Sequence, residues 1–372
     1  MYYQPSLLGW MIVMSLESIA LSFVPQLGVR GAAHLVDCFG SARAGYAASQ
    51  DELIQRAELR ADVARSITLK RGFAEAEREL AFCKAHGITA VGCDQELYPP
   101  LLREIEDFPM AIYVRGNVEA LRRPTVSFVG TRKISPYGQR MCDKLVQELH
   151  EVVPDAVVVS GLAYGVDGAC HRAALACGAV TVGVVANALP NVTPTVHERL
   201  AADMIAQGGA VVSELHSQTK QNGRFYIPRN RIIAALSAGT VVVESAESGG
   251  SLSTVAFADG YNRSVMAVPG RVVDANSMGC NMLIRNRKAQ MVLSGRDVVE
   301  ELRWEMGLEH MPAPKCEKLP LTDDEANFMM HFGSEPVALD VLQMRSGLSS
   351  GELSLMLMNL ELSGVVRQLP GK

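Results

Sequence analysis

The sequence predicts an α/β protein whose central domain is a mostly parallel β-sheet, with a helical domain before it and another after it along the chain. Seven short apolar runs lie between residues 125 and 293, and they show no alternation of polar and apolar residues. Helical stretches lie between them, which is typical of parallel strands covered on both faces. Glycine-bearing turns follow several runs, so we expect a Rossmann-like sheet that holds a ligand at its strand ends.

Composition limits the class of protein. The chain has 372 residues, 48% hydrophobic and 20% charged, which is enough for two or three domains with real cores. Its eight cysteines include no CxxC pair, which indicates reduced thiols in the cytosol. No His/Cys/Asp cluster has metal-ligand spacing, and no GxxxxGK[ST] loop occurs. We therefore expect a cytoplasmic protein with no metal or other cofactor and no P-loop nucleotide hydrolysis.

Residues 1–85 are predicted to form a helical domain, because apolar positions recur at spacings of three and four and glycines end the segments. The apolar stretch at 6–24 is nearly long enough to cross a bilayer, but Glu17 lies in its middle and no basic region accompanies it. We expect a buried helix there and no membrane contact. Met14 is the expected natural start, which would make the residues before it an upstream extension.

The central domain is predicted to span residues 86–310, with its motifs between 125 and 290. The expected strands are 125–129, 156–160, 180–185, 210–214, 240–244, 264–268 and 291–293. The expected helices between them are 137–152, 167–178, 197–208, 230–239 and 251–261. Residues 88–117 are interpreted as a bridge that carries several prolines.

The C-terminal segment reads as a separate small domain. A linker rich in proline and lysine, residues 311–321, leads to three predicted helices within 322–372. Their size and order are those of a winged helix-turn-helix, with 348–361 as recognition helix and the wing starting at 365. Residues 317–372 carry a local net charge of −4. We expect this domain to contact protein or to be structural.

Charge is spread unevenly along the chain. The formal net charge of −5, taken alone, argues against a nucleic-acid binder. However, the windows 120–142, 215–243 and 275–296 hold five, four and four Lys or Arg and no acid. These windows coincide with glycine-bearing motifs, so we expect a phosphate chain as ligand, most simply single-stranded DNA.

Two glycine turns follow the first two strands of the predicted sheet. Gly130-Thr131-Arg132-Lys133 would let backbone N–H groups approach a phosphate, with Arg132 as a bidentate partner. Ser160-Gly161 opens the second turn, and Asp167 and His171 follow at i, i+4 spacing. No Ser or Cys nucleophile stands at a matching spacing from that pair. We therefore expect Asp167 to open its helix and His171 to pack and bond locally.

A basic cluster, Arg229-Asn230-Arg231, follows Phe225-Tyr226 and opens a helix. Two guanidiniums at a helix start suit successive phosphates, and a flanking aromatic can stack a base. We expect one arginine to bind and the other to be structural, pairing with Glu244. Ser248-Gly249-Gly250-Ser251 forms a second anion nest, and a fifth element at 279–284, which contains Asn281, is also expected at a strand carboxyl end.

In this order, the segments resemble those of the DprA/Smf DNA-processing family. They read VGTRKISPYG, SGLAYGVDGACHRAAL, RNRIIAALS, VVVESAESGGSLSTVAFA, AVPGR and SMGCNMLIRN, after a bridge YPPLLREIEDFPMAIYVRGN that is also similar. The resemblance extends from about residue 16 to the end of the chain. It implies a domain like a sterile alpha motif or helix-hairpin-helix, then an extended Rossmann domain and a winged helix.

The same resemblance implies a non-enzymatic homodimer of natural transformation (competence), joined through the Rossmann domain. Such a protein would bind incoming single-stranded DNA without sequence specificity, protect it from nucleases and help load the recombinase RecA. The expected DNA-binding residues are Gly130, Thr131, Arg132, Lys133, Ser160, Gly161, Arg224, Tyr226, Arg229, Asn230, Arg231, Ser248, Gly249, Gly250, Ser251 and Asn281.

This chain departs from the family pattern in three places, one of which is its end at Lys372, where relatives continue through the second strand of the wing. Tyr226 stands where the family more often has Phe, and the neighbouring proline is displaced to Pro228. The N-terminal turn is Pro25-Gln26-Leu27-Gly28 and lacks the first glycine of PGVG, which weakens a DNA contact there.

Two rival functions come from other classes. Nucleoside-monophosphate phosphoribohydrolases are similar around the glycine loop, but they carry PGGxGTxxE, and residues 248–256 hold no glutamate where the catalytic one would fall. A regulator that acts through the winged helix would bind duplex DNA tightly instead.

Overall fold

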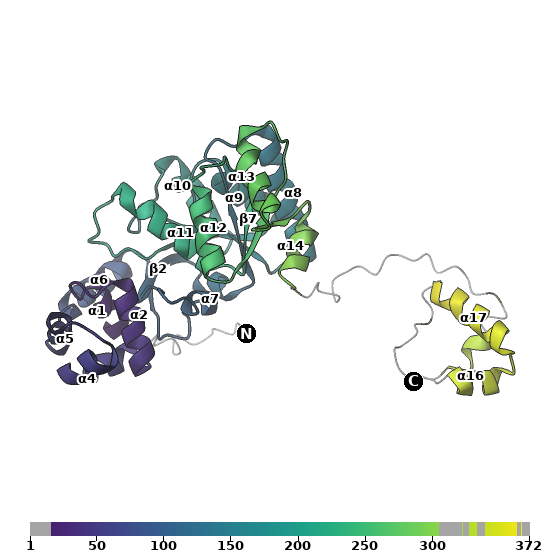
Figure 1. Cartoon of the computed structure of the whole chain (residues 1–372), viewed down its shortest axis with the longest axis horizontal. Helices are drawn as coiled ribbons and strands as arrows, with labels where there is room; N and C mark the ends of the chain where they lie inside the picture. The colour runs from purple at the N-terminus through teal and green to yellow at the C-terminus, as the bar shows by residue number, and fades with distance from the viewer. Residues whose placement is uncertain (1–15, 305–321, 323–326, 333–338, 363–365, 367–372) are drawn as a thin grey trace, which may run out of the picture. The chain divides into compact units, whose positions relative to one another are not determined.

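The computed structural model describes residues 16–304, 322, 327–332, 339–362 and 366. The chain divides into two compact units, Met1–Met306 and Gly307–Lys372. Figure 1 shows the first unit as short helices followed by a sheet with helices on both faces. The finer domain boundaries at 85, 310 and 321 stay predictions.

Six short helices form the N-terminal part of the first unit. They are α1 (Leu16–Ser22), α2 (Gly28–Phe39), α3 (Ala42–Ala47), α4 (Gln50–Arg56), α5 (Ala61–Thr68) and α6 (Phe73–Ala85). α1 buries Ile19 and Leu21, so the buried helix expected in the apolar N-terminal stretch is confirmed over the described residues. Residues 6–15 of that stretch lie outside the described residues. Among the helices described, none has the length and apolar character that crossing a membrane requires.

The sheet has nine strands within the described residues, in the order β1-β2-β6-β5-β4-β3-β7-β8-β9. They are β1 (Thr89–Gly92), β2 (Ala111–Gly116), β3 (Thr125–Val129), β4 (Val157–Ser160), β5 (Val180–Val184), β6 (Ala210–Ser213), β7 (Gly239–Val242), β8 (Ser264–Ala267) and β9 (Gln290–Met291). From β6 to β9 every neighbouring pair is parallel, which confirms the predicted sheet.

The two strands that the sequence did not predict are β1 and β2, inside the segment interpreted as a bridge. β1 pairs antiparallel with β2, and β2 pairs antiparallel with β6. Prolines 99, 100 and 109 lie between the two strands and hide their pattern. The mixed sheet therefore has an antiparallel edge beside the N-terminal helices.

Alternate residues of the central strands supply two separate cores. Val126 and Phe128 of β3 pack with α8 (Pro136–Val152), α9 (Val166–Cys177) and α14 (Gly295–Glu301) on one face. On the other face, Val129 joins the cluster that contains α11 (Tyr226–Ala235) and α12 (Ser251–Gly260). The remaining helices of this part are α7 (Pro100–Arg103), α10 (Glu198–Ala206) and α13 (Met278–Arg285). Strands buried on both faces explain why the apolar runs lack alternation.

The N-terminal helices hold the loop that leads from β6 to α11. Glu79 on α6 is almost fully buried, and its carboxylate accepts hydrogen bonds from the backbone N–H (2.8 Å) and the hydroxyl of Ser217. The rings of Phe23 and His216 lie 4.5 Å apart between centroids. This loop precedes the basic cluster, so the helical part helps to place α11.

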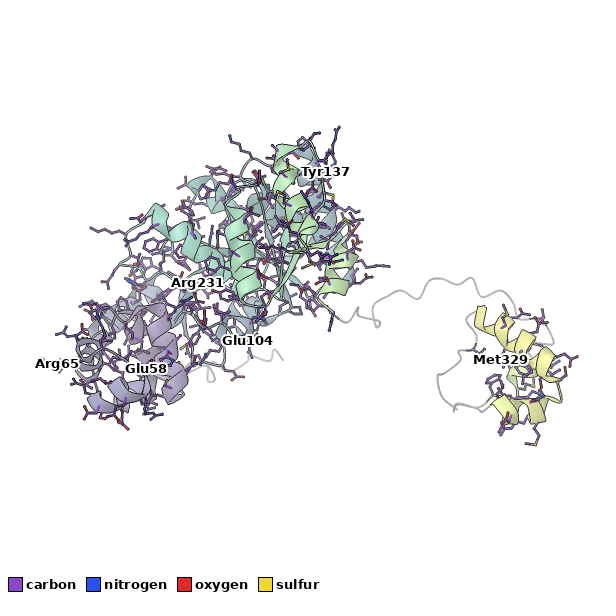
Figure 2. The ribbon with its side chains drawn as sticks, in the orientation of Figure 1. Glu58, Arg65, Glu104, Tyr137, Arg231 and Met329 are labelled. Atoms are coloured by element: carbon purple, nitrogen blue, oxygen red, sulfur yellow. The ribbon has the colours of Figure 1, made fainter. Side chains whose placement is uncertain are left out.

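The second unit packs α16 (Leu339–Ser346) and α17 (Ser350–Leu362) with a helical segment at 327–329. Its small core contains Phe328, Leu342, Leu353 and Leu360. Met329, labelled in Figure 2, packs against that core. Ser349 and Glu352 cap the start of α17. The predicted helices thus agree with the structure where it describes them, and the wing lies outside the described residues apart from Val366.

Candidate nucleic-acid interface

The topology of the sheet fixes where a ligand site is expected. The chain enters the parallel region at β3, adds β4, β5 and β6 on one side, and then returns to add β7 on the other side. The loops after β3 and β7 therefore separate at a topological switch point, where open α/β sheets bind ligands. A cavity of about 390 Å³ lies there.

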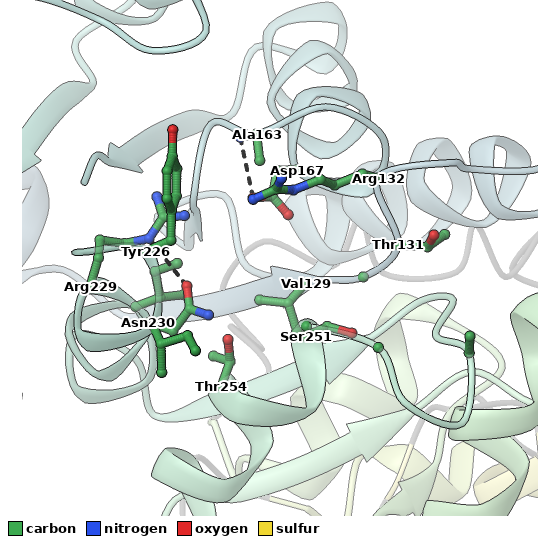
Figure 3. A pocket seen from close by; sticks show the side chains of 16 residues that line it. Val129, Thr131, Arg132, Ala163, Asp167, Tyr226, Arg229, Asn230, Ser251 and Thr254 are labelled. Carbon is green, nitrogen blue, oxygen red and sulfur yellow. Dashed lines mark hydrogen bonds between the residues drawn. The ribbon is translucent and has the colours of Figure 1, made fainter. Parts of the chain in front are cut away.

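Figure 3 shows the side chains around this cavity, which we call the switch-point pocket. It is lined by Val129, Gly130, Thr131, Arg132, Ala163, Asp167, Tyr226, Ile227, Arg229, Asn230, Ile233, Ala246, Gly249, Gly250, Ser251 and Thr254. Most of these residues follow β3, β4 and β7 or lie at the start of α9, α11 and α12, while Val129 ends β3 and Ile233 lies in the second half of α11. Three helix N-termini thus border one pocket, and the dipoles of these helices favour an anion there.

A large part of the pocket wall is apolar, which a site for phosphate alone would not need. Val129, Ile227 and Ile233 line it together with two alanines and the ring of Tyr226. Pockets of this size with apolar walls and a few polar groups are typical of small organic ligands. The arrangement suits a flat ring inside, with an anion beside it at the helix starts.

Two guanidiniums lie near the ring of Tyr226. The Cζ atom of Arg132 is 5.4 Å from the ring centroid, and that of Arg229 is 6.0 Å from it. Both distances are within the range of cation–π attraction. Arg132 is exposed and makes no ion pair within the part of the chain that the structure describes. Its guanidinium is therefore available to an anionic ligand.

Arg229 is part of the wall of the pocket and is held in place on several sides. Its side chain is buried, and Nη1 donates to the carbonyl of Gly161 (2.6 Å) and to that of Val184. Its Nε donates to the amide oxygen of Asn230 (3.2 Å). Burial lowers the pKa of Arg229, and the carboxylate of Asp167 opposes that shift. The buried guanidinium of Arg229 therefore places a fixed positive charge at the wall of the pocket.

Asp167 lines the pocket, whereas His171 does not. The Asp167 carboxylate accepts the N–H of Ala163 (3.3 Å), and burial raises its pKa while Arg229 opposes the shift. His171 is fully buried, and its Nδ1 lies 2.7 Å from the hydroxyl of Thr181. Burial lowers the pKa of His171 to about 3. The structure thus confirms that His171 packs and bonds locally.

Gly161 has to be a glycine at this place. A Cβ there would lie 2.6 Å from the Asp167 carboxylate and 2.9 Å from Cζ of Arg229. The absence of a side chain at Gly161 therefore leaves room for the Asp167 carboxylate and the Arg229 guanidinium.

The structure brings many of the predicted residues into the pocket lining. They are Gly130, Thr131, Arg132, Tyr226, Arg229, Asn230, Gly249, Gly250 and Ser251. Lys133, Arg224 and Ser248 are exposed and lie outside the lining. The DNA contact expected of these three stays a prediction.

Arg231 is a correction to the expected site. Nη1 donates to the carbonyl of Asp107 (2.7 Å), and the guanidinium pairs with Glu214, both side chains being largely buried. Arg231, labelled in Figure 2, does not line the pocket, because residues two apart on a helix point to different sides. It is the structural arginine that the sequence anticipated.

The predicted partner of that arginine was wrong. Among the described residues Glu244 pairs with no arginine; it accepts hydrogen bonds from the N–H of Ser135 (2.9 Å) and from the hydroxyl of the same residue. This contact fixes the start of α8, and Glu214 takes the place expected of Glu244.

Ser160 and Asn281 also have structural partners. The buried hydroxyl of Ser160 donates to the carbonyl of Phe128 (2.6 Å). The amide of Asn281 accepts the N–H of Gly270 (3.1 Å) and donates to the carbonyl of the same residue (3.0 Å). Neither side chain lines the pocket: Ser160 ends β4, and Asn281 lies on α13, not at the strand end expected of it, and holds the loop after β8.

Sequence reasoning missed the apolar part of the lining. Ile227 and Ile233 flank the basic cluster, and Ile227 is 63% exposed. An isoleucine beside a basic helix start was a usable signal, but it also fits a core position. In the described segments, no three His, Cys, Asp or Glu side chains gather closely enough to hold a metal ion.

Two protein families match segments of this chain. Residues 89–303 match the family model described as DNA recombination-mediator protein A, and residues 312–372 match the DprA winged helix domain. The second match confirms the predicted C-terminal fold.

Two curated relatives illustrate the sequence similarity. The chain is 35% identical over 293 residues to protein Smf of Escherichia coli, which covers 76% of this chain and 75% of that protein. It is 39% identical over 210 residues to the DNA processing protein DprA of Streptococcus pneumoniae, covering 56% of this chain and 72% of that one.

Two solved structures are similar as well. The X-ray structure of DprA from Streptococcus pneumoniae has a TM-score of 0.66 and 29% identity, covering 77% of this chain and 98% of that chain. DNA processing protein A from Helicobacter pylori, which is described as having a unique single-stranded DNA binding mode, has a TM-score of 0.52 and 26% identity. That match covers 59% of this chain and 96% of that chain.

Proposed function

The chain belongs to the DprA/Smf DNA-processing family, and from that premise we propose that it binds single-stranded DNA without sequence specificity through the switch-point pocket. The observation that carries the proposal is the combination of apolar walls, an aromatic ring and an exposed guanidinium in one cavity of about 390 Å³. The ssDNA-binding relative from Helicobacter pylori supports the choice of ligand.

In the proposed complex, one nucleotide of the strand occupies the pocket. Its base lies against Tyr226 and the isoleucine walls, while the adjoining phosphates meet Arg132 and the starts of α11 and α12. Stacking uses the face of any base, so it tolerates any sequence. The phosphate contacts add affinity without reading sequence.

The same geometry favours a single strand over a duplex. A base inside a duplex must be unpaired and unstacked before it can enter a pocket, which costs a few kcal/mol. A single strand avoids most of that cost. We therefore expect weaker binding to blunt duplex of the same length.

We also propose that the protein acts in natural transformation as a homodimer joined through the Rossmann domain, protecting incoming strands and helping to load RecA. Family membership supports this part. Nuclease protection of a labelled strand, sedimentation velocity, and RecA filament formation on a protected strand test its three components separately.

We propose further that the pocket binds and does not catalyse. Asp167 is the carboxylate in the lining. It is buried and accepts a hydrogen bond from the N–H of Ala163, and the charge of Arg229 lowers its pKa against the effect of burial. A general base needs a carboxylate that can reach a ligand proton. Release of adenine from AMP by the purified protein would contradict this proposal.

The direct test is fluorescence anisotropy with labelled oligo-dT, over a series of salt concentrations. Arg132→Ala should weaken binding and lower the salt slope by about 0.7, as expected for one lost phosphate contact on a single strand. Arg43→Ala is the matched control, because Arg43 is an exposed arginine on α3. If Arg132→Ala binds like the control at every salt concentration, the pocket is not where the strand binds.

A further inference from the structure

An exposed aromatic side chain lies next to the switch-point pocket and is not used by the function proposed above. Tyr164 is 54% exposed and lies on the loop between β4 and α9. The preceding residue, Ala163, lines the pocket and is labelled in Figure 3. Because about half of this side chain is exposed, its burial contributes little to the stability of the fold, and the exposed part of the ring is free to contact a ligand.

The loop that carries Tyr164 is held rigidly. Leu162 and Gly165 both have positive φ, at 54° and 77°. The N–H of Ala163 donates to Asp167 (3.3 Å), and the N–H of Gly168 donates back to the carbonyl of Ala163 (3.1 Å). A ring on such a loop loses little conformational entropy when a ligand stacks on it.

A histidine lies beside this ring, and an arginine lies close to that histidine over Gly168. The ring of His197 is 5.5 Å from that of Tyr164, between centroids, and is tilted by 53°. A Cβ on Gly168 would lie 3.0 Å from Cε1 of His197 and 3.2 Å from Nη1 of Arg172, so both side chains pass over that glycine. Arg172 is exposed and makes no ion pair among the described residues.

Arg132 connects this cluster to the pocket. A Cβ on Gly165, the residue after Tyr164, would lie 2.7 Å from Cα of Arg132. The guanidinium of Arg132 is in turn 5.4 Å from the ring of Tyr226. The backbone of Arg132 therefore lies against the loop that carries Tyr164, and its guanidinium lies near the ring of Tyr226 at the start of α11.

We propose that Tyr164 and Arg172 form a second nucleotide subsite, which holds the nucleotide adjacent to the one in the switch-point pocket. This inference rests on the proposed binding of single-stranded DNA. The adjacent base stacks on the exposed face of Tyr164, whose other surroundings include His197. Its phosphate meets Arg172 on one side and shares Arg132 with the nucleotide in the pocket. An aromatic platform next to unpaired cations is the usual arrangement for holding successive nucleotides of a single strand.

The test compares a ligand that fills one subsite with a ligand that fills both. dTMP competes for the pocket alone, whereas the four-nucleotide oligo-dT reaches both subsites. Tyr164→Ala should lower the affinity for the oligonucleotide about tenfold, which is within the range measured for one base–aromatic stack. The same variant should leave competition by dTMP unchanged. Tyr164→Phe keeps the ring and should bind like the parent chain. Leu69→Ala is the matched control, since Leu69 is 58% exposed on the N-terminal helices.

A second variant separates the phosphate contact from the stack. Arg172→Gln should lower the salt slope for the oligonucleotide by about 0.7 and leave dTMP competition unchanged. Arg43→Gln, on α3, should change neither measurement.

The outcomes distinguish this inference from the proposed function. If Tyr164→Ala binds oligo-dT like the parent while Tyr226→Ala weakens both ligands, the second subsite is wrong and the pocket stands. If the parent chain binds no single-stranded DNA at all, the proposed function is wrong, and the second subsite is then wrong as well. Equal loss of dTMP and oligonucleotide in Tyr164→Ala would mean that Tyr164 only supports the pocket, which also overturns the second subsite.

Discussion

The fully buried imidazole of His171 should make the stability of the first unit depend on pH in a defined direction. Burial, with smaller contributions from His197 and Arg172, lowers the pKa of His171 in the folded chain from 6.5 to about 3. The folded chain therefore keeps this imidazole neutral at pH 5, whereas the unfolded chain protonates it. Its contribution to stability is fully present above pH 6.5 and is lost as the pH falls from there towards 3.

The size of this effect follows from the two pKa values. With an unfolded pKa of about 6.5, lowering the pH from 7 to 5 costs about 2 kcal/mol, because each pH unit of full proton uptake costs about 1.4 kcal/mol. The folded imidazole, with a pKa of about 3, stays neutral at pH 5, so the whole proton uptake occurs in the unfolded chain. For a large domain this corresponds to about 4–8 °C in Tm.

The assay is thermal unfolding of the full chain and of His171→Gln at pH 7 and pH 5. The glutamine amide can keep a hydrogen bond to Thr181, which lies 2.7 Å from Nδ1 of His171, but it does not titrate in this range. The parent should lose about 4–8 °C more than the variant when the pH falls, while other titrating groups cancel in the comparison. An equal fall in Tm for both chains would refute the assignment of His171 as a buried neutral group.

Three further predictions concern other parts of the molecule. Arg231→Ala leaves the buried carboxylate of Glu214 unpaired and should cost about 3–5 kcal/mol in unfolding free energy by urea titration; an unchanged midpoint would contradict the structural role. Gly161→Ala places a methyl 2.9 Å from Cζ of Arg229 and should destabilise the chain by about 1–3 kcal/mol and weaken oligo-dT binding, so a variant with parental anisotropy would speak against the tight contact. Leu353→Ala should cost the second unit about 2–5 kcal/mol, seen as earlier loss of its own hydrogen-exchange protection, and should leave the Tm of the first unit unchanged.

The corrections to the predicted site share a physical reason. Residue types indicated that Arg229 and Arg231 were a basic pair, but helical geometry sends them to different sides, and Glu214 lies beside only one of them. Ser160 stands at the end of β4 as expected, whereas Asn281 lies on α13, and the polar atoms of both side chains bond to backbone groups. A polar side chain near a loop can hydrogen-bond either to a ligand or to the backbone of the loop, and the residue type alone does not distinguish the two.

The sequence by itself determined the fold class and the edge of the sheet where the site lies. Uninterrupted apolar runs separated by helical stretches require strands buried on both faces, and glycines after those runs mark the loops that can approach a ligand. These are local properties, in which neighbours along the chain decide the outcome. The parallel strands, the flanking helices and most of the pocket lining follow from them.

Only the tertiary structure decided which side chains meet. β7 pairs with β3, more than a hundred residues earlier in the chain, and that pairing closes the pocket between Arg132 and Ser251. The antiparallel edge formed by β1 and β2 and the pairing of Arg231 with Glu214 likewise depend on segments brought together by packing. Such contacts depend on strand order and helix orientation, which composition and spacing do not encode locally, so their partners became known only once the chain was folded.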